Sequence, residues 1–369
     1  MYKVEINHYN KKNYLTIIYC IFFFRRLLNA LVPKELIYWN DMRKTQKKLI
    51  WIFTVVFSLF GGALIVFFLS TEIQILKPIE QLQIKVGKQF WEWHSPYGPL
   101  AIHYIEKGEG PHHLLLLHGF RAHSFTWKAL MDPLTGAGYH VWSIDFIGYG
   151  LSDKPEQDIY NDNFFVQQIY AFMQAKNIEN VHLIGSSMGG GLAMSLALDH
   201  PKEIRSLTLL NALAYPLEMP LSLYLGKHIG SLWSPFLGPT LVRYGLKQIF
   251  YHADKISDEQ VEAYSLPYRF PGGVTAPLLT LQNFNNQRLV EMGCHYPSLI
   301  HPMLIIWGDH DTLIPLSHYE NFIRDFPNAE KLLIKNCGHL PQEEEPEQVL
   351  TAILNFLQKN LFGHPVQIQ

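Results

Sequence analysis

A serine flanked by glycines, between an apolar run and a helical pattern, most constrains how this chain can fold. The apolar run covers 181–184 and leads into Gly185 to Gly189, which reads Gly-Ser-Ser-Met-Gly. Small residues suited to a helix follow over 190–197. A Gly-x-Ser-x-Gly between a strand and a helix is typical of a nucleophile elbow, a sharp turn that exposes the serine hydroxyl. We therefore predict a strained backbone at Ser187, with glycines that let the chain pass close to itself.

Short apolar runs that end at turn residues recur along the chain. Such runs are typical of interior strands of a parallel sheet, which are buried on both faces. Helical stretches alternate with them, and this alternation predicts an α/β fold with a doubly wound, mostly parallel sheet. The predicted strands are 101–106, 113–117, 141–144, 181–184, 207–210, 303–307 and 331–334, and the helices between or after them include 164–176, 189–199, 318–325 and 346–359.

One connection is too long for a simple crossover. About 90 residues separate the strand that ends near Asn211 from the one that starts near Met303, and they are rich in Leu, Tyr, Phe and Pro. Helical patterns occur within them at 239–251 and 257–266. We predict a helical cap over 213–298, inserted after the sixth strand and lying over the carboxyl ends of the strands, where active sites form in this architecture.

The N-terminal part is strongly apolar. The run 49–69 spans 21 residues without a charge, enough for about 30 Å of helix. Arginines and lysines crowd 43–48, before the run, whereas Glu72 is the first charge after it. The positive-inside rule then predicts a single-pass membrane protein with its catalytic domain on the non-cytoplasmic side. The range 70–90 is predicted to be a linker, with the folded domain starting near Trp91.

Residues 1–48 form a basic and apolar segment with three open interpretations. The apolar stretches 15–24 and 27–32 could form a second span, which would reverse the topology of the rest. An interfacial helix is an alternative. Translation could also begin at Met42, which would leave 1–41 outside the mature protein.

Composition excludes several classes of function. The net charge of −2 and the lack of a basic stripe argue against a nucleic-acid partner. Cys20, Cys294 and Cys337 show no paired spacing, so neither a disulfide framework nor a cysteine metal site is expected. We predict no cofactor and no metal.

Five motifs in a fixed order carry a resemblance to a known family. They are His118 to Phe120 (His-Gly-Phe), Asp145 to Asp153, Gly185 to Gly189, Gly308 to Pro315 and Gly338 to Pro341. The chain over 91–362 resembles the α/β-hydrolase superfamily, and within it the membrane-anchored monoacylglycerol lipases and the carbon–carbon-bond hydrolases. The resemblance implies a core over 91–212 and 299–362 around the cap.

The stretch Asp145 to Asp153 is also similar to epoxide hydrolases and haloalkane dehalogenases. Those enzymes carry aspartate at the elbow, where this chain has Ser187. Asp145 itself is interpreted as structural, because it ends a strand and can hold the glycine-rich turn after it through backbone hydrogen bonds. The acidic run 343–345 is interpreted as a solvated helix start.

The resemblance and the chemistry together predict a catalytic triad. Serine alone is a poor nucleophile at neutral pH and needs a base, for which we predict His339, on the loop after the last strand. Asp311 is predicted to orient that imidazole, with Asp309 as the weaker alternative. Some family members place the acid after the preceding strand, but that position here is Asn211. The order serine, aspartate, histidine is the α/β-hydrolase order.

The oxyanion formed during acyl transfer needs two backbone N–H donors. We predict them at Met188, after the nucleophile, and at Phe120. The predicted function is a serine hydrolase that cleaves carboxylic esters of lipid-like substrates through an acyl-enzyme. One alternative is a carbon–carbon-bond hydrolase of a dienoic keto acid, which would use the same triad and would need a basic residue in the pocket, such as Arg121 or Arg243, to bind the acid group. The other is a non-catalytic binding protein of the same fold.

Overall fold

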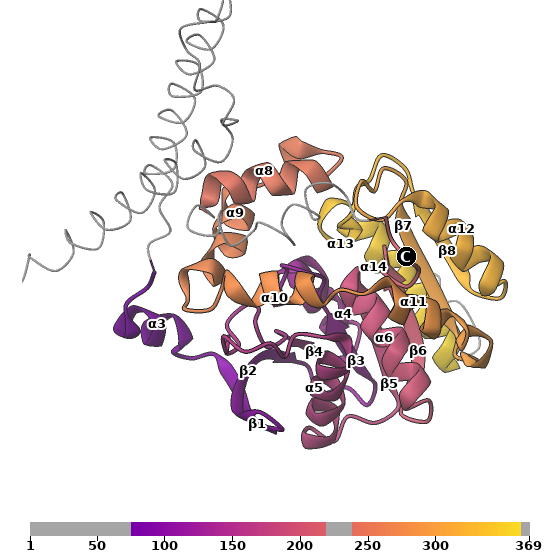
Figure 1. The fold of residues 1–369 in the computed structure, drawn as a ribbon. Coiled ribbons are helices and arrows are strands. Elements are labelled where there is room, and N and C mark those ends of the chain that lie inside the picture. The colour runs from indigo at the N-terminus through magenta and orange to yellow at the C-terminus, as the bar shows by residue number, and fades with distance from the viewer. Residues whose placement is uncertain (1–74, 219–237, 363–369) are drawn as a thin grey trace, which may run out of the picture. The chain divides into compact units, whose positions relative to one another are not determined.

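The computed structural model describes residues 75–218 and 238–362 (Figure 1). They build an eight-stranded sheet in the order β1-β2-β4-β3-β5-β6-β7-β8. The pairs β1–β2 and β2–β4 are antiparallel, and every other neighbouring pair is parallel. The strands are β1 (Gln89–Ser95), β2 (Gly98–Lys107), β3 (His113–Leu117), β4 (His140–Ile144), β5 (Val181–Ser186), β6 (Ile204–Leu210), β7 (Met303–Gly308) and β8 (Glu330–Ile334).

Helices cover both faces of this sheet, which confirms the predicted α/β class. Strand side chains alternate between the faces, and in β3 both sets are buried. Leu115 and Leu117 belong to a core with α5 (Asp162–Ala175), α6 (Met188–Asp199) and α12 (Leu316–Asp325). Leu114 and Leu116 belong to a second core with α4 (Lys128–Gly136) and α14 (Pro346–Phe362). Burial on both faces explains why the sequence shows continuous apolar runs at these strands.

The long insertion lies between β6 and β7. Its described helices are α8 (Pro239–Ile249), α9 (Asp258–Ser265), α10 (Thr275–Asn283) and α11 (Asn286–Gly293). Figure 1 shows α8 and α9 beyond one end of the sheet. A third apolar cluster joins Val242 and Leu246 of α8 to Val261 of α9, and also includes Ala122 and Leu340 from loops of the core. The insertion is thereby packed onto the loops that follow β3 and β8.

The range 70–90, predicted to be a linker, contains regular structure. Pro78 begins the helix α3 (Pro78–Lys85), and β1 begins at Gln89. Leu76 is buried and its N–H donates to the Arg269 carbonyl at 2.8 Å, so this segment contacts the insertion. The sequence did not predict this contact because it joins segments far apart in the chain.

The predicted membrane location is contradicted and is withdrawn. Over 75–218 and 238–362 no helix has the length and apolar character needed to cross a bilayer. The longest helix of those ranges, α14, has 17 residues and a mixed surface, whereas a span needs about 20 apolar residues. The run 49–69, on which the prediction depended, lies outside the described residues, as do the alternatives for 1–48.

Candidate active site

Ser187 occupies a sharp turn between a strand and a helix. β5 ends at Ser186 and α6 begins at Met188, which leaves Ser187 at φ 53° and ψ −120°. A non-glycine residue with positive φ is strained and persists only where its surroundings enforce it. A Cβ on Gly185 would meet the Gly189 carbonyl oxygen at 2.4 Å, and a Cβ on Gly189 would meet the Leu117 carbonyl oxygen at 2.2 Å. Only glycine fits these positions, so the elbow has the strained geometry that its motif predicts.

The predicted base and acid are hydrogen-bonded to each other. The Nδ1 atom of His339, on the loop after β8, lies 2.7 Å from Oδ2 of Asp311, on the loop after β7. Both side chains are almost fully buried. The other oxygen of Asp311 accepts the N–H groups of Leu313 at 2.8 Å and Ile314 at 3.0 Å, which fixes the carboxylate. The alternative acid Asp309 instead pairs with its neighbour His310 and with Lys335.

Asn211 supports this carboxylate and was missed as a site residue. Its Nδ2 donates to Oδ2 of Asp311 at 2.6 Å, and its Oδ1 accepts the Gly308 N–H at 3.2 Å. It is fully buried and adopts φ 44°, a conformation that asparagine tolerates better than most residues. From the sequence, Asn211 indicated only that no rival acid follows the preceding strand. The sequence feature that could have predicted this role is a polar side chain directly after β6, the strand that pairs with β7.

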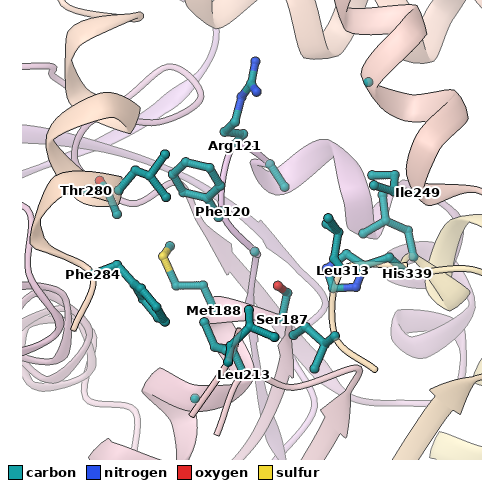
Figure 2. A pocket seen from close by; sticks show the side chains of 18 of the residues that line it. Phe120, Arg121, Ser187, Met188, Leu213, Ile249, Thr280, Phe284, Leu313 and His339 are labelled. Atoms are coloured by element: carbon teal, nitrogen blue, oxygen red, sulfur yellow. The ribbon is translucent and has the colours of Figure 1, made fainter. Parts of the chain in front are cut away.

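Ser187 and His339 line one cavity of about 440 Å³, together with Phe120 and Met188. Figure 2 shows these four side chains around the same space. Asp311 does not line the cavity and joins the set through its 2.7 Å hydrogen bond to His339. The structure therefore brings all five predicted site residues together.

The backbone around Ser187 can supply oxyanion donors. Met188 is the first residue of α6, and the first N–H groups of a helix have no acceptor within that helix. The Gly119–Phe120 backbone passes close to the serine, since a Cβ on Gly119 would lie 3.0 Å from the Ser187 Cβ and 3.6 Å from its Oγ. A developing negative charge at this point would face the positive end of the α6 dipole.

A buried histidine fixes the loop that carries Phe120. Nδ1 of His118 donates to the Gly119 carbonyl at 2.8 Å, and Nε2 accepts the Phe146 N–H at 3.0 Å. This pattern needs the neutral imidazole. Burial lowers the pKa of His118 to about 4, so the neutral form prevails at pH 7. His118 thus links the loop after β3 to the loop after β4 through the hydrogen bonds of its ring.

Asp145 holds the neighbouring loop, in agreement with its structural interpretation. It is fully buried, and its carboxylate accepts the N–H groups of Ser124 at 2.7 Å and Leu151 at 2.8 Å. Nδ1 of His103 lies 2.8 Å from the same carboxylate. Burial by itself raises the pKa of Asp145, but the attraction and hydrogen bond of His103 outweigh it, so the pKa is lowered.

The acidic run 343–345 is not a solvated helix start, which corrects that interpretation. Glu344 is only 2% exposed, and its carboxylate accepts the N–H groups of Gly338 at 2.8 Å, Tyr251 at 2.8 Å and His252 at 3.1 Å. The buried Gly338 N–H needs an acceptor, and Glu344 supplies it. Burial also raises the pKa of Glu344. The carboxylate links the loop that carries His339 to the insertion.

The remaining walls of the cavity are mostly apolar and come largely from the insertion. The acidic and basic residues among them are Arg121, Asp162 and His339. Asp162 lies 3.1 Å from Nε of Arg288 and is therefore paired. Within the described ranges, no three His, Cys, Asp or Glu residues are placed to hold a metal ion. The apolar lining consists of residues such as Leu192, Leu213, Leu217, Leu241, Val242, Leu246, Ile249, Leu281, Phe284, Leu289, Met292, Leu313 and Ile314.

Comparison with known proteins shows the family to which this chain belongs. The model of the alpha/beta hydrolase fold family matches residues 112–229 and 249–346. A 2-hydroxy-6-oxononadienedioate/2-hydroxy-6-oxononatrienedioate hydrolase of Paraburkholderia xenovorans (strain LB400) is 26% identical over 275 residues, which cover 70% of this chain and 91% of that protein.

Two solved structures have the same fold. An alpha/beta hydrolase fold protein from Burkholderia ambifaria matches with a TM-score of 0.65 and 23% identity, over 72% of this chain and 96% of its own. A bacterial membrane phospholipase A matches with a TM-score of 0.63 and 25% identity, over 84% of this chain and 98% of its own. The family model covers more than half of the sequence and includes the Ser187 elbow and the His339 loop, so this chain belongs to the alpha/beta hydrolase fold family.

Proposed function

We propose that this protein is a serine hydrolase that cleaves carboxylic esters with an apolar acyl group. One observation carries the proposal. Ser187, in a strained elbow, shares an apolar cavity with His339, and His339 is held by Asp311. A nucleophile, a base and a group that orients the base are the parts that acyl transfer needs.

In the proposed reaction, His339 takes the proton of the Ser187 hydroxyl while the serine oxygen attacks the ester carbonyl. Asp311 holds the imidazole by its Nδ1 atom, which leaves Nε2 as the proton acceptor, and it stabilises the imidazolium that forms. The N–H groups of Met188 and Phe120 bind the oxyanion, and losing one such donor typically costs about 2.7–4 kcal/mol of transition-state stabilisation.

Collapse of the tetrahedral intermediate breaks the bond to the leaving oxygen, and His339 gives its proton to that oxygen, which leaves as an alcohol. The acyl group remains on Ser187 as an ester. His339 then removes a proton from water, the hydroxide attacks the acyl-enzyme, and the proton returns to the Ser187 oxygen as the carboxylic acid leaves. No cofactor enters these steps.

A lipid-like acyl chain suits the cavity. Leucine, isoleucine, phenylalanine and methionine side chains from both the core and the insertion form most of its wall, and each buried methylene contributes about 0.8 kcal/mol. The resemblance to a membrane phospholipase A supports the same substrate class. We propose a medium or long acyl ester such as a monoacylglycerol. In this proposal 91–212 and 299–362 supply the catalytic core, and the cap over 213–298 supplies the acyl pocket.

Hydrolysis of a carbon–carbon bond in a dienoic keto acid is the second candidate. The relative from Paraburkholderia xenovorans is named for a substrate of this kind. A basic side chain in the cavity would bind the acid group of such a substrate. Arg121 lines the cavity, whereas Arg243 does not and pairs with Asp258. The same serine and histidine would serve both reactions.

A substrate panel tests the proposal. We expect kcat/KM for p-nitrophenyl esters to rise with acyl length by about fourfold per methylene until the cavity is filled, and Ser187→Ala to abolish this activity. Ser186→Ala is the matched control, because Ser186 is fully buried and does not line the cavity. Activity confined to acetate esters would contradict a lipid-like substrate. Turnover of a 2-hydroxy-6-oxo-dienoate well above that of every ester would favour the second candidate.

A further inference from the structure

Arg121 is a charged residue in an unusual place on the cavity wall. It follows Phe120, and among the described residues it is the only lysine or arginine that lines the cavity. Its backbone has φ 61°, a strained value for a side chain of this size, and such strain persists at sites where the surroundings enforce it. Figure 2 shows its side chain extending from this loop away from Ser187. The guanidinium is thus separated from the reacting atoms but shares their cavity.

Tyr268, in the short helix η5 (Leu266–Arg269) of the insertion, orients this guanidinium. The Nε–H of Arg121 donates to the Tyr268 hydroxyl at 2.7 Å, and the guanidinium carbon lies 5.3 Å from the centre of the ring. Tyr268 is itself buried. Tyr268 binds only the inner nitrogen, and among the described residues the two terminal nitrogens of Arg121 have no hydrogen-bond partner, so they are available to a ligand.

Nothing in the described part of the chain neutralises Arg121. No carboxylate there forms an ion pair with it, although Arg243 pairs with Asp258, Arg269 with Glu262 and Arg288 with Asp162. Arg121 is exposed in the structure, so its guanidinium is accessible to a ligand. The terminal nitrogens of a guanidinium match the two oxygens of a carboxylate or phosphate, with which they form charge-assisted bonds.

We propose that Arg121 binds an oxyanion group of the substrate, a carboxylate or a phosphate, several bonds away from the scissile carbonyl. The preferred substrates would then be anionic esters. This inference rests on the proposed ester hydrolysis and narrows its substrate class. Arg121 is on this view a specificity-determining residue and takes no part in the proton transfers.

The test compares esters that share a decanoyl chain and differ only in the alcohol. They are 1-decanoylglycerol, its 3-phosphate, and the decanoyl ester of 4-hydroxybutyrate, which carries a carboxylate. The readout is the ratio of kcat/KM for each anionic ester to that for the neutral one. We expect Arg121→Gln to lower this ratio by about 10- to 100-fold, the range for a lost charge-assisted hydrogen bond, and Arg121→Lys to lower it less. The arm with the larger loss identifies phosphate or carboxylate as the group that Arg121 binds.

Arg243→Gln is the matched control, because Arg243 lies on α8 outside the cavity lining and is paired. It should change the ratio by less than about twofold, since a paired surface charge contributes little. An unchanged ratio in Arg121→Gln would overturn the inference and leave ester hydrolysis standing.

A binding measurement separates the inference from the proposed function. Non-hydrolysable 1-decylglycerol and 1-decylglycerol 3-phosphate are titrated into the wild type and Arg121→Gln by calorimetry. We expect the phosphate to bind more tightly than the neutral ether to the wild type, and this preference to fall about tenfold or more in the variant. Equal binding of both ethers to the wild type would overturn the inference. A different outcome would contradict the proposed function alone. In that outcome the wild type prefers the phosphate, Arg121→Gln loses this preference, and the wild type cleaves no ester.

Discussion

Two buried aspartate–histidine pairs in this chain have nearly the same geometry and different surroundings. Asp311 and His339 are 2.7 Å apart, and Asp145 and His103 are 2.8 Å apart. In each pair the aspartate follows a strand of the sheet, its carboxylate is fully buried, and it also accepts two backbone N–H groups.

The two pairs differ in whether their histidine lines the cavity. His339 lines the cavity that contains Ser187, whereas the ring of His103 lies 5.3 Å from the ring of Phe90 and does not line it. An aspartate–histidine hydrogen bond is therefore no evidence of catalysis by itself. The comparison predicts that one pair controls turnover and the other controls stability.

The largest expected difference is between the two histidines. We expect His339→Gln to lower kcat for an ester by roughly 10⁴- to 10⁶-fold, because the serine loses its base. His103→Gln should lower kcat by less than about tenfold, since His103 cannot reach the substrate. Steady-state kinetics of both variants, with folding checked by circular dichroism, measure the contrast. Comparable losses in the two variants would contradict the assignment.

The second largest effect is expected for Asp311→Asn, which should lower kcat. Asp311→Asn keeps the shape of the side chain but removes the charge that stabilises the imidazolium, so we expect kcat to fall by about 10⁴-fold. The melting temperature provides the check on folding. A kcat near that of the wild type would show that another group orients His339, and Asp309 would then be the residue to test.

Asp145→Asn should act on stability. It leaves buried N–H groups with a weaker acceptor, and we expect the free energy of unfolding at pH 7 to fall by about 3 kcal/mol, as when one partner of a buried pair is removed. The pKa of Asp145 is lowered in the folded state, so its stabilisation is present above the ordinary aspartate pKa.

That stabilisation is lost as the pH falls below about 4, towards the folded-state pKa. Urea denaturation from pH 7 to pH 3 measures this effect. The wild type should lose stability over this range more steeply than Asp145→Asn. Parallel curves for the two proteins would show that Asp145 does not titrate as proposed.

Asn211→Ala should give the smallest of these effects. Its amide donates to the same Asp311 oxygen that binds His339, and losing one hydrogen bond to a charged group corresponds to about tenfold in kcat. Asn360→Ala offers a matched control, because the Asn360 amide bonds to the Phe356 carbonyl within α14 and Asn360 does not line the cavity. An unchanged kcat in Asn211→Ala would mean that Leu313 and Ile314 suffice to hold the carboxylate.

The sequence predicted those parts of the fold that follow from local patterns. The apolar runs located the inner strands, as at 113–117, because a strand buried on both faces needs an apolar side chain at every position. The elbow motif predicted the strain at Ser187, since its glycines are sterically required. The length of the connection between Asn211 and Met303 predicted the insertion.

The missed features depend on contacts between distant parts of the chain. Asn211 lies 100 residues from Asp311, and Glu344 lies 93 residues from Tyr251. An acidic run has the same local pattern whether it is solvated or accepts buried N–H groups, so its burial could not be inferred. The absence of an ion-pair partner for Arg121 among the described residues is likewise a property of the assembled cavity.

Covalent labelling of Ser187 tests the central claim most directly. A fluorophosphonate probe reacts with a serine only when a neighbouring base and oxyanion donors activate it. Peptide mapping after labelling should place the probe on Ser187 in the wild type and in Ser186→Ala, with no label in folded Ser187→Ala. A folded wild-type protein that takes up no probe, or labelling that persists in Ser187→Ala, would contradict the account.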